Sequence, residues 1–186
     1  VFLSGKGAED FAIERGLVQV DQSYFFTKKN YDKLIQVKME NQDIKKEKIG
    51  TVGAVAIDFQ NNISAGTSTG GMTNKRYGRV GDVPVIGAGT YAENGVCGIS
   101  ATGHGEFFIR NVVAYDIAAR IKYKNENIQK ASRDVIENLK SIGGLGGVIG
   151  LDHNKNVVMP FNTKGMFRGY ISEKGEPVVM IYGDQN

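Results

Sequence analysis

The chain has 186 residues, of which 41% are hydrophobic and 23% are charged, and its net charge is +3. This length allows a substantial buried core, while the small, evenly spread charge and the short basic runs argue against a nucleic-acid partner. The single cysteine, Cys97, excludes an internal disulfide, and the absence of a long apolar run argues against a membrane span, so we expect a cytoplasmic protein.

The first 50 residues show the pattern of two helices followed by an exposed linker. Apolar residues recur at helical spacing in residues 7–16, where Gly16 is expected to end the helix, and residues 27–40 predict a second helix. Residues 41–48, NQDIKKEK, are polar and lysine-rich and lack periodicity, which is typical of an exposed linker. The composition therefore places a boundary near residue 50.

From Thr51 onwards the sequence turns to strand patterns and glycine-rich turns. Residues 51–67 predict a hairpin of two buried strands, and residues 68–83 predict a polar loop. Two amphipathic helices are expected at 106–122 and 127–141. Further extended segments are expected at residues 83–91, 96–101, 147–152, 156–161, 165–171 and 177–182. Strands, two helices and strands again in one core predict an α+β fold.

The junction between Gly50 and Thr51 is the first of three places where chemistry is expected. Here the polar linker meets an apolar strand, in KIG followed by TVGAV. A threonine at a new chain terminus combines a hydroxyl nucleophile with an α-amine of pKa about 7.7–8, which can take the hydroxyl proton at neutral pH. By itself, however, the junction favours the simpler interpretation that a β-branched residue begins a strand.

The second place is the run STGGMTNK, which is followed by GRVGD. Arg79 and Asp82 carry opposite charges and lie three residues apart, with a glycine between them. An arginine binds a carboxylate with two parallel hydrogen bonds and an aspartate accepts from an ammonium, so together they could hold both charged groups of an α-amino acid. The spacing is equally consistent with an ion pair between the two side chains at a surface turn.

The third place is the segment ATGHGE at residues 101–106, between an expected strand and an expected helix. The Thr102 hydroxyl and the backbone amides at the start of the helix could stabilise a developing oxyanion. A plain cap on the helix is an equally good interpretation of the segment alone.

Together these segments resemble the β-subunit of the isoaspartyl peptidase/plant-type asparaginase family. The motifs that carry the resemblance within residues 51–186 are GTVGAVAIDF, AGTSTGGMTNK, GRVGDVPVIGAGTYA, ATGHGEFFIR, GGVIGLD and PFNTKGMFRG. Residues 1–50 resemble, more weakly, the C-terminal part of the α-subunit with its linker. Members of the family are N-terminal-nucleophile hydrolases that cleave themselves into the two subunits. The resemblance therefore implies an αββα sandwich whose N-terminal part is absent from this sequence.

The resemblance also implies a function and a role for each candidate residue. The expected activity is hydrolysis of β-aspartyl dipeptides and L-asparagine to release L-aspartate. Thr51 would be the nucleophile, released by cleavage after Gly50, and Thr69 would assist it through its hydroxyl. The other implied roles are an oxyanion hole (Thr102 and Gly103), a carboxylate site (Arg79), an amine site (Asp82) and a pocket wall (Gly71). His104 departs from the family pattern, because relatives often carry a smaller residue there, and this could alter the rim of the pocket.

The implied partners are a small-molecule substrate, the remainder of the α-subunit and a second αβ unit in a dimer. No cofactor or metal is expected in this chain, while a structural sodium ion is expected in the α-subunit part outside it. One alternative is a glycosylasparaginase cleaving N-acetylglucosaminyl-asparagine, although that sister family usually has aspartate where this chain has Gly50. The other alternative is an unprocessed, inactive homologue that binds amino acids.

Overall fold

The computed structural model describes residues 2–40 and 50–183, which fall into two compact units. The smaller unit contains the first two α-helices and residues 72–77, and the larger unit contains all the strands and the remaining helices. The predicted linker at 41–48 lies outside the described residues. Within the described ranges, no helix has the length and apolar character needed to cross a lipid bilayer.

The smaller unit is helical, as the sequence predicts. Helix α1 spans Gly5–Glu14, the short 3-10 helix η1 spans Gln22–Phe25 and helix α2 spans Lys28–Glu40. Helix α1 ends just before Gly16, whose φ of +73° is the left-handed conformation that commonly closes a helix. The sequence pattern does not predict η1, which is only one turn long.

The larger unit begins with a hairpin in which β1 (Thr51–Ile57) pairs antiparallel with β2 (Ile63–Thr69). The prediction of two buried strands is wrong in one respect, because burial alternates along both strands and only one face is covered. The exposed face of β1 carries three small or medium apolar side chains, Val52, Ala54 and Ala56. The hairpin is therefore a layer with an inner and an outer side.

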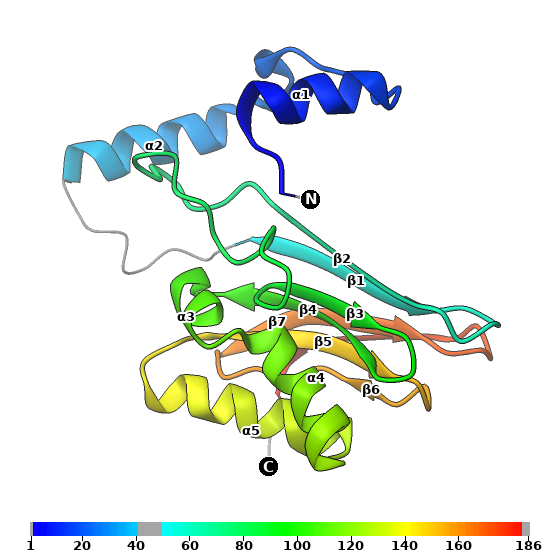
Figure 1. Cartoon of the computed structure of the whole chain (residues 1–186). Helices are drawn as coiled ribbons and strands as arrows, with labels where there is room; N and C mark the ends of the chain where they lie inside the picture. The colour runs from blue at the N-terminus through cyan, green and yellow to red at the C-terminus, as the bar shows by residue number, and fades with distance from the viewer. Residues whose placement is uncertain (1, 41–49, 184–186) are drawn as a thin grey trace. The chain divides into compact units, whose positions relative to one another are not determined.

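An antiparallel sheet forms the centre of the larger unit. Its strands, in spatial order, are β3 (Thr90–Glu93), β4 (Cys97–Gly103), β5 (Gly146–Asp152) and β6 (Val157–Val158). The hairpin β1–β2 packs on one face of this sheet, and helices α4 (Val113–Lys124) and α5 (Ile128–Ser141) pack on the other (Figure 1). The main core lies between the sheet and these helices; among its fully buried residues are Ile99, Phe108, Ile117, Leu139 and Val148.

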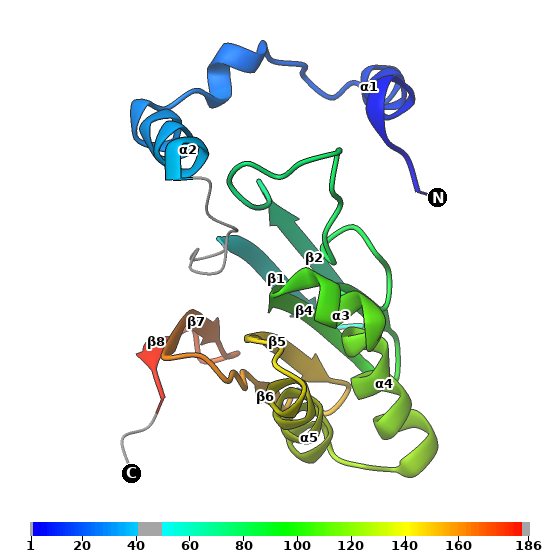
Figure 2. The same ribbon diagram turned by 90° about the vertical axis from the view of Figure 1, so that its left-hand side faces the viewer.

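Small residues let the hairpin approach the sheet closely. A Cβ at Gly98 of β4 would lie 2.6 Å from Val55 and 2.7 Å from Ile63, and a Cβ at Gly53 of β1 would lie 2.0 Å from the Ser100 hydroxyl. The remaining strands, β7 (Gly165–Ile171) and β8 (Pro177–Tyr182), form a second hairpin on the side of β5 opposite α5 (Figure 2). The two hairpins thus cover one face of the sheet.

The predicted single helix at 106–122 is divided into α3 (Gly105–Arg110) and α4. The break lies at Val112, which has a φ of +48°, an unusual conformation for a β-branched residue. After the break, the amides of Ala114 and Tyr115 donate to backbone carbonyls in the loop that precedes β3, at 3.2 Å and 2.8 Å. The chain therefore exchanges a continuous helix for hydrogen bonds that fix this loop.

Two other predicted segments differ from the structure. Residues 83–89 are a succession of turns rather than a strand, with Gly87 at a φ of +89°, and β3 begins only at Thr90. The strand expected at 156–161 is reduced to the short β6 and an isolated bridge from Phe161 to Gly147. Cys97 is a buried residue as expected, and burial raises the pKa of its thiol to about 12, so the thiol stays protonated at neutral pH.

Candidate active site

Three threonines lie at one end of the stacked strands. Thr51 and Thr69 are direct partners in the β1–β2 register. Further along the hairpin, Gly53 packs against Ser100 of β4, and side chains two residues apart on a strand share a face. Thr102 is therefore on the face of β4 that meets the hairpin, at the end of the strand nearer to Thr51. The fold thus brings together three of the predicted residues from two separate layers.

The Thr69 hydroxyl is held between two backbone groups. Its Oγ1 donates to the carbonyl oxygen of Gly50 at 2.9 Å and accepts from the amide of Gly71 at 3.0 Å. Gly71 has a φ of +77°, which turns the chain sharply after β2 and directs this amide back at Thr69. The hydroxyl proton of Thr69 therefore points at the carbonyl of the Gly50–Thr51 peptide bond.

A cluster of hydroxyl groups lies next to the three threonines, further inside the hairpin and the sheet. Thr67 Oγ1 and Ser100 Oγ lie 2.6 Å apart, and Thr90 donates to Thr67 at 2.5 Å. These residues come from β2, β4 and β3, and Thr67 precedes Thr69 by two positions on the same face of β2. The cluster links three strands by hydrogen bonds, two residues along β2 from Thr69. It fixes the spacing between the hairpin and the sheet, on which the distance between Thr69 and β4 depends.

Gly103 is required by its surroundings at the end of β4. It has a φ of +156°, and a Cβ there would lie 2.4 Å from the carbonyl of Leu145 and 2.5 Å from the Phe108 ring. The next residue, His104, donates its amide to the same Leu145 carbonyl at 2.8 Å and directly precedes α3. The backbone at Thr102 and Gly103 is thus fixed from both sides, as a pre-organised hydrogen-bond donor requires.

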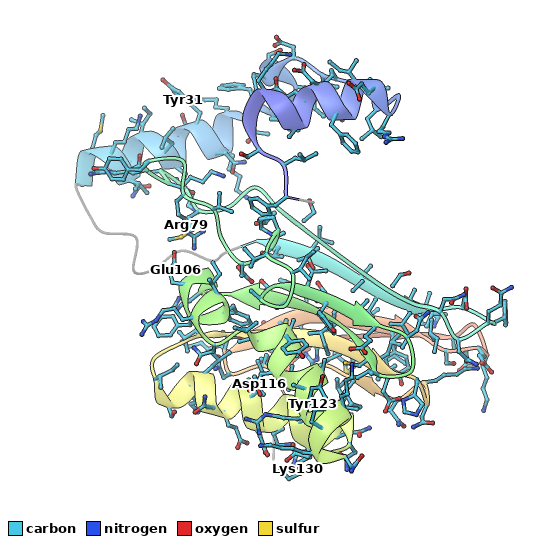
Figure 3. The ribbon with its side chains drawn as sticks, in the orientation of Figure 1. Tyr31, Arg79, Glu106, Asp116, Tyr123 and Lys130 are labelled. Atoms are coloured by element: carbon cyan, nitrogen blue, oxygen red, sulfur yellow. The ribbon has the colours of Figure 1, made fainter. Side chains whose placement is uncertain are left out.

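Arg79 and Asp82 do not form the ion pair that their spacing permits. Arg79 instead binds Glu106 of α3: its Nε and Nη2 contact Oε1 of Glu106 at 2.7 Å and 2.5 Å, and the two side chains meet in Figure 3. Gly105, the first residue of α3, lies against both Arg79 and Asp82: a Cβ there would lie 2.7 Å from Asp82 Oδ1 and 3.1 Å from Arg79 Nη2. Arg79, Asp82 and α3 therefore form one charged cluster.

Asp82 is a buried carboxylate with an unsatisfied oxygen. Only 5% of the residue is exposed, and its Oδ2 has no hydrogen-bond partner within residues 2–40 and 50–183. Burial raises the pKa of Asp82, against the opposing effects of its own backbone amide and of the Arg79 charge, while the charge of Glu106 raises it further. A buried carboxylate oxygen of this kind is suited to accept a hydrogen bond from a cationic ligand.

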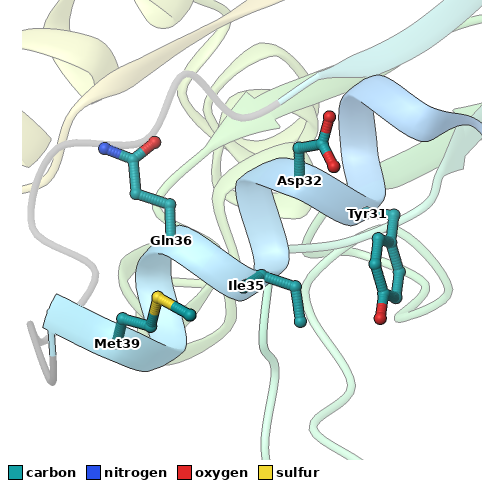
Figure 4. Close-up of a pocket in the computed structure, with 5 residues that line it drawn as sticks. All are labelled: Tyr31, Asp32, Ile35, Gln36 and Met39. Carbon is teal, nitrogen blue, oxygen red and sulfur yellow. The ribbon is translucent and has the colours of Figure 1, made fainter.

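The sequence pattern missed Gly105 and Glu106, although both lie in the ATGHGE segment. The two glycines flanking His104 are a signal of close backbone approach, but nothing in the spacing connects Glu106 with Arg79, 27 residues earlier. In the described part of the chain, no three His, Cys, Asp or Glu side chains gather as in a metal site. A hollow on helix α2, lined by Tyr31, Ile35 and Met39 among others, contains none of the predicted site residues (Figure 4).

Comparison with known proteins places the chain in a family. A model of the asparaginase family matches residues 1–181. The chain belongs to the asparaginase family. Among curated members, it is 45% identical over 195 residues to a protein of Escherichia coli K12 named isoaspartyl peptidase, covering 100% of this chain and 61% of that protein. It is 43% identical over 192 residues to the isoaspartyl peptidase of Salmonella typhimurium, covering 98% of this chain and 61% of that protein.

The resemblance to this family that the motifs indicate is thus confirmed. The chain spans 61% of the length of each of these two asparaginase-family relatives. The fold described above is a mixed α/β fold with sheets and helices, consistent with the family.

Proposed function

We propose that this chain is part of a self-cleaving amidohydrolase that uses Thr51 as its nucleophile and releases L-aspartate from β-aspartyl dipeptides and L-asparagine. The observation that carries the proposal is the hydrogen bond from Thr69 to the carbonyl of Gly50, directly beside Thr51 in the strand register. A hydroxyl donor aimed at a peptide carbonyl is what an attack on that carbonyl needs. The relatives named isoaspartyl peptidase support the same reaction class.

Self-cleavage would proceed in two steps at the Gly50–Thr51 bond. The Thr51 hydroxyl attacks the carbonyl carbon of Gly50, and the Thr69 hydroxyl stabilises the negative charge that develops on the carbonyl oxygen. The C–N bond then breaks and the Thr51 nitrogen takes up the proton that its hydroxyl has lost, which leaves an ester between Gly50 and Oγ1 of Thr51. Water hydrolyses the ester and yields a Gly50 carboxylate and a free Thr51 α-amine.

The mature enzyme would use the same threonine on its substrate. The α-amine of Thr51 takes the proton of its own hydroxyl, which attacks the side-chain amide carbon of the substrate. The Thr102 hydroxyl and the Gly103 amide are the proposed donors to the resulting oxyanion, because the backbone there is fixed by Leu145 and Phe108. Ammonia or an amino acid leaves, and water releases aspartate from the acyl-enzyme.

The charged cluster would determine which amide is cut. Arg79 would hold the substrate α-carboxylate, and the unpartnered Oδ2 of Asp82 would accept from its α-ammonium. A substrate held in this way presents its side-chain carbonyl, so the bond cut is a β-amide. Ordinary α-linked aspartyl peptides have no free α-carboxylate and cannot bind in this manner.

Finer features of the assembly belong to the same proposal. The arrangement of two hairpins, a sheet and helices supplies three layers, and an αββα sandwich would add a fourth layer from α-subunit residues outside this sequence. A division at residue 50 into an α-subunit part and a β-subunit, a dimer of αβ units and a sodium ion in the α-subunit are likewise proposed from the family resemblance. A cytoplasmic location is part of the same proposal.

The test of self-cleavage is N-terminal sequencing of the full-length protein after purification. The expected result is a fragment that begins Thr-Val-Gly, together with intact precursor for Thr51→Ala. Processing of Thr51→Ala at the parental rate would remove Thr51 from the role of nucleophile. Intact, soluble and inactive wild-type protein would favour an unprocessed homologue that binds amino acids.

The test of substrate class compares four compounds on the processed enzyme. We expect hydrolysis of L-asparagine and β-Asp-Leu, no hydrolysis of α-Asp-Leu and poor hydrolysis of N-acetylglucosaminyl-asparagine. Half-buried His104 precedes α3 and is proposed to border the leaving-group side. Rapid cleavage of the glycosylated asparagine alone would contradict the proposal and indicate a glycosylasparaginase.

A further inference from the structure

Arg79 uses only one of its two carboxylate-binding edges in the pair with Glu106. A guanidinium group presents an Nε–Nη2 edge and an Nη1–Nη2 edge, and each can receive a carboxylate. Glu106 Oε1 lies 2.7 Å from Nε and 2.5 Å from Nη2, so it occupies the first of these edges. Nη2 belongs to both edges, but Glu106 does not contact Nη1, the other nitrogen of the second edge.

Two glycines lie against the terminal nitrogens of the Arg79 guanidinium. A Cβ at Gly81 would lie 3.0 Å from Nη1, and a Cβ at Gly105 would lie 3.1 Å from Nη2. The same Cβ at Gly105 would lie 2.7 Å from Oδ1 of Asp82. Side chains at these positions would press on Nη1 and Nη2, whereas glycine adds no side-chain atoms there. Gly105 thus lies against both the Arg79 guanidinium and the buried carboxylate of Asp82.

We propose that Glu106 is a positioning residue, which holds the Nε–Nη2 edge of Arg79 so that the Nη1–Nη2 edge meets the α-carboxylate of the substrate. The inference rests on the proposed function, because it requires a substrate with a free α-carboxylate. An arginine that is already held in one rotamer loses less conformational entropy when the substrate binds. Glu106 acts on substrate affinity through Arg79 and does not itself touch the substrate.

The electrostatics of the pair support this role. Partial burial raises the pKa of Glu106, but its own backbone amide together with the hydrogen bond and charge of Arg79 outweighs that effect, so the pKa is lowered overall. Glu106 is thus ionised at neutral pH and makes a charge-assisted hydrogen bond. Its side chain is 59% exposed, and such pairs contribute little to folding stability, so substitutions here are tolerated by the fold.

Two substitutions separate orientation from charge. Glu106→Asp keeps the charge but withdraws it by one methylene from Nε and Nη2, whereas Glu106→Gln keeps an oxygen acceptor in place without the charge. For L-asparagine hydrolysis we expect Glu106→Asp to raise KM roughly ten- to one-hundred-fold, and Glu106→Gln to raise KM by less than about fivefold. In both variants kcat and the extent of self-cleavage stay within about threefold of the parent.

Asp116 of α4 supplies a matched control. It accepts from Nε and Nη2 of Arg120 at 3.0 Å and 3.3 Å, which makes it a second arginine–carboxylate pair at a different place on the larger unit (Figure 3). Asp116→Ala should change neither KM nor kcat. The inference is overturned if Glu106→Asp leaves KM unchanged, if Glu106→Gln raises KM more than Glu106→Asp, or if either variant lowers kcat in proportion to a loss of folded protein.

The same experiment keeps the two proposals apart. Thr51→Ala, assayed beside the Glu106 variants, should be inactive; asparagine hydrolysis by that variant would refute the proposed function itself. An inactive Thr51→Ala with an unchanged KM in Glu106→Asp would refute only the positioning role. Glu106 would then be a surface partner of Arg79 without influence on the substrate.

Discussion

Replacement of Thr69 by valine tests how far its hydroxyl contributes to self-cleavage. Valine has the shape of threonine but no donor, so Thr69→Val removes only the 2.9 Å hydrogen bond to Gly50 and the 3.0 Å bond from Gly71. Loss of one donor to an oxyanion typically slows a reaction by about 10²–10³-fold. Because Thr69 is exposed, water can partly replace it, and we expect a slowing near the lower value, about 10²-fold.

The assay follows the fraction of intact precursor with time after denaturant-free purification, by gel electrophoresis and mass spectrometry. Thr69→Ser keeps the hydroxyl and should process within about threefold of the parent rate. Ser68→Ala removes the neighbouring hydroxyl on the outer face of β2 and should leave the rate unchanged. The reasoning is refuted if Thr69→Val processes at the parental rate, or if Ser68→Ala slows processing as much.

Replacements of Asp82, Arg79 and Gly53 test the charged cluster and the close packing of the hairpin. Burial raises the pKa of Asp82, so the folded state binds the carboxyl proton more tightly than the unfolded chain does. The free energy of unfolding therefore falls as the pH rises from the ordinary aspartate pKa through the raised pKa of the folded state. Asp82→Asn should therefore have a higher Tm than the parent at pH 7, measured by calorimetry, and should lose asparagine hydrolysis. A lower Tm would contradict this. Arg79→Ala should lower kcat/KM for asparagine by roughly 30- to several-thousand-fold and affect self-cleavage less; parental hydrolysis by the folded variant would exclude the clamp. Gly53→Ala would place a Cβ 2.0 Å from the Ser100 hydroxyl and should cost about 1–3 kcal/mol in urea unfolding, a cost that Ser100→Gly should reduce.

Local patterns predict those elements whose stability is itself local. Helix α5 begins and ends as periodicity predicts, and the Asn127 side chain caps it by accepting from the Lys130 amide at 2.8 Å. The break at Val112 could not be predicted in this way, because the amides of α4 donate to carbonyls of a loop more than twenty residues earlier. The same loop was expected to be extended, and it is instead shaped by these distant partners.

The candidate site shows the same limit. Motifs single out Thr51, Thr69 and Thr102, and the strand register brings these residues to one end of the hairpin and the sheet. Spacing alone leaves open whether Arg79 pairs with Asp82, and the structure answers with Glu106, from a helix that follows two intervening strands. Opposite charges that are close in sequence indicate only that an ion pair is possible. The tertiary packing around Gly105 determines which carboxylate Arg79 contacts.

The position of Thr51 in the β1–β2 ladder has a consequence for the chain end that cleavage would create. Chain termini usually fray unless a sheet or a docked helix holds them. Thr51 is paired with Thr69, and the pairing continues without a gap to Ile57 opposite Ile63. A cut before Thr51 would therefore release a reactive amine that is anchored by an entire strand. The new terminus would remain paired in the β1–β2 ladder, which would keep the nucleophile opposite Thr69.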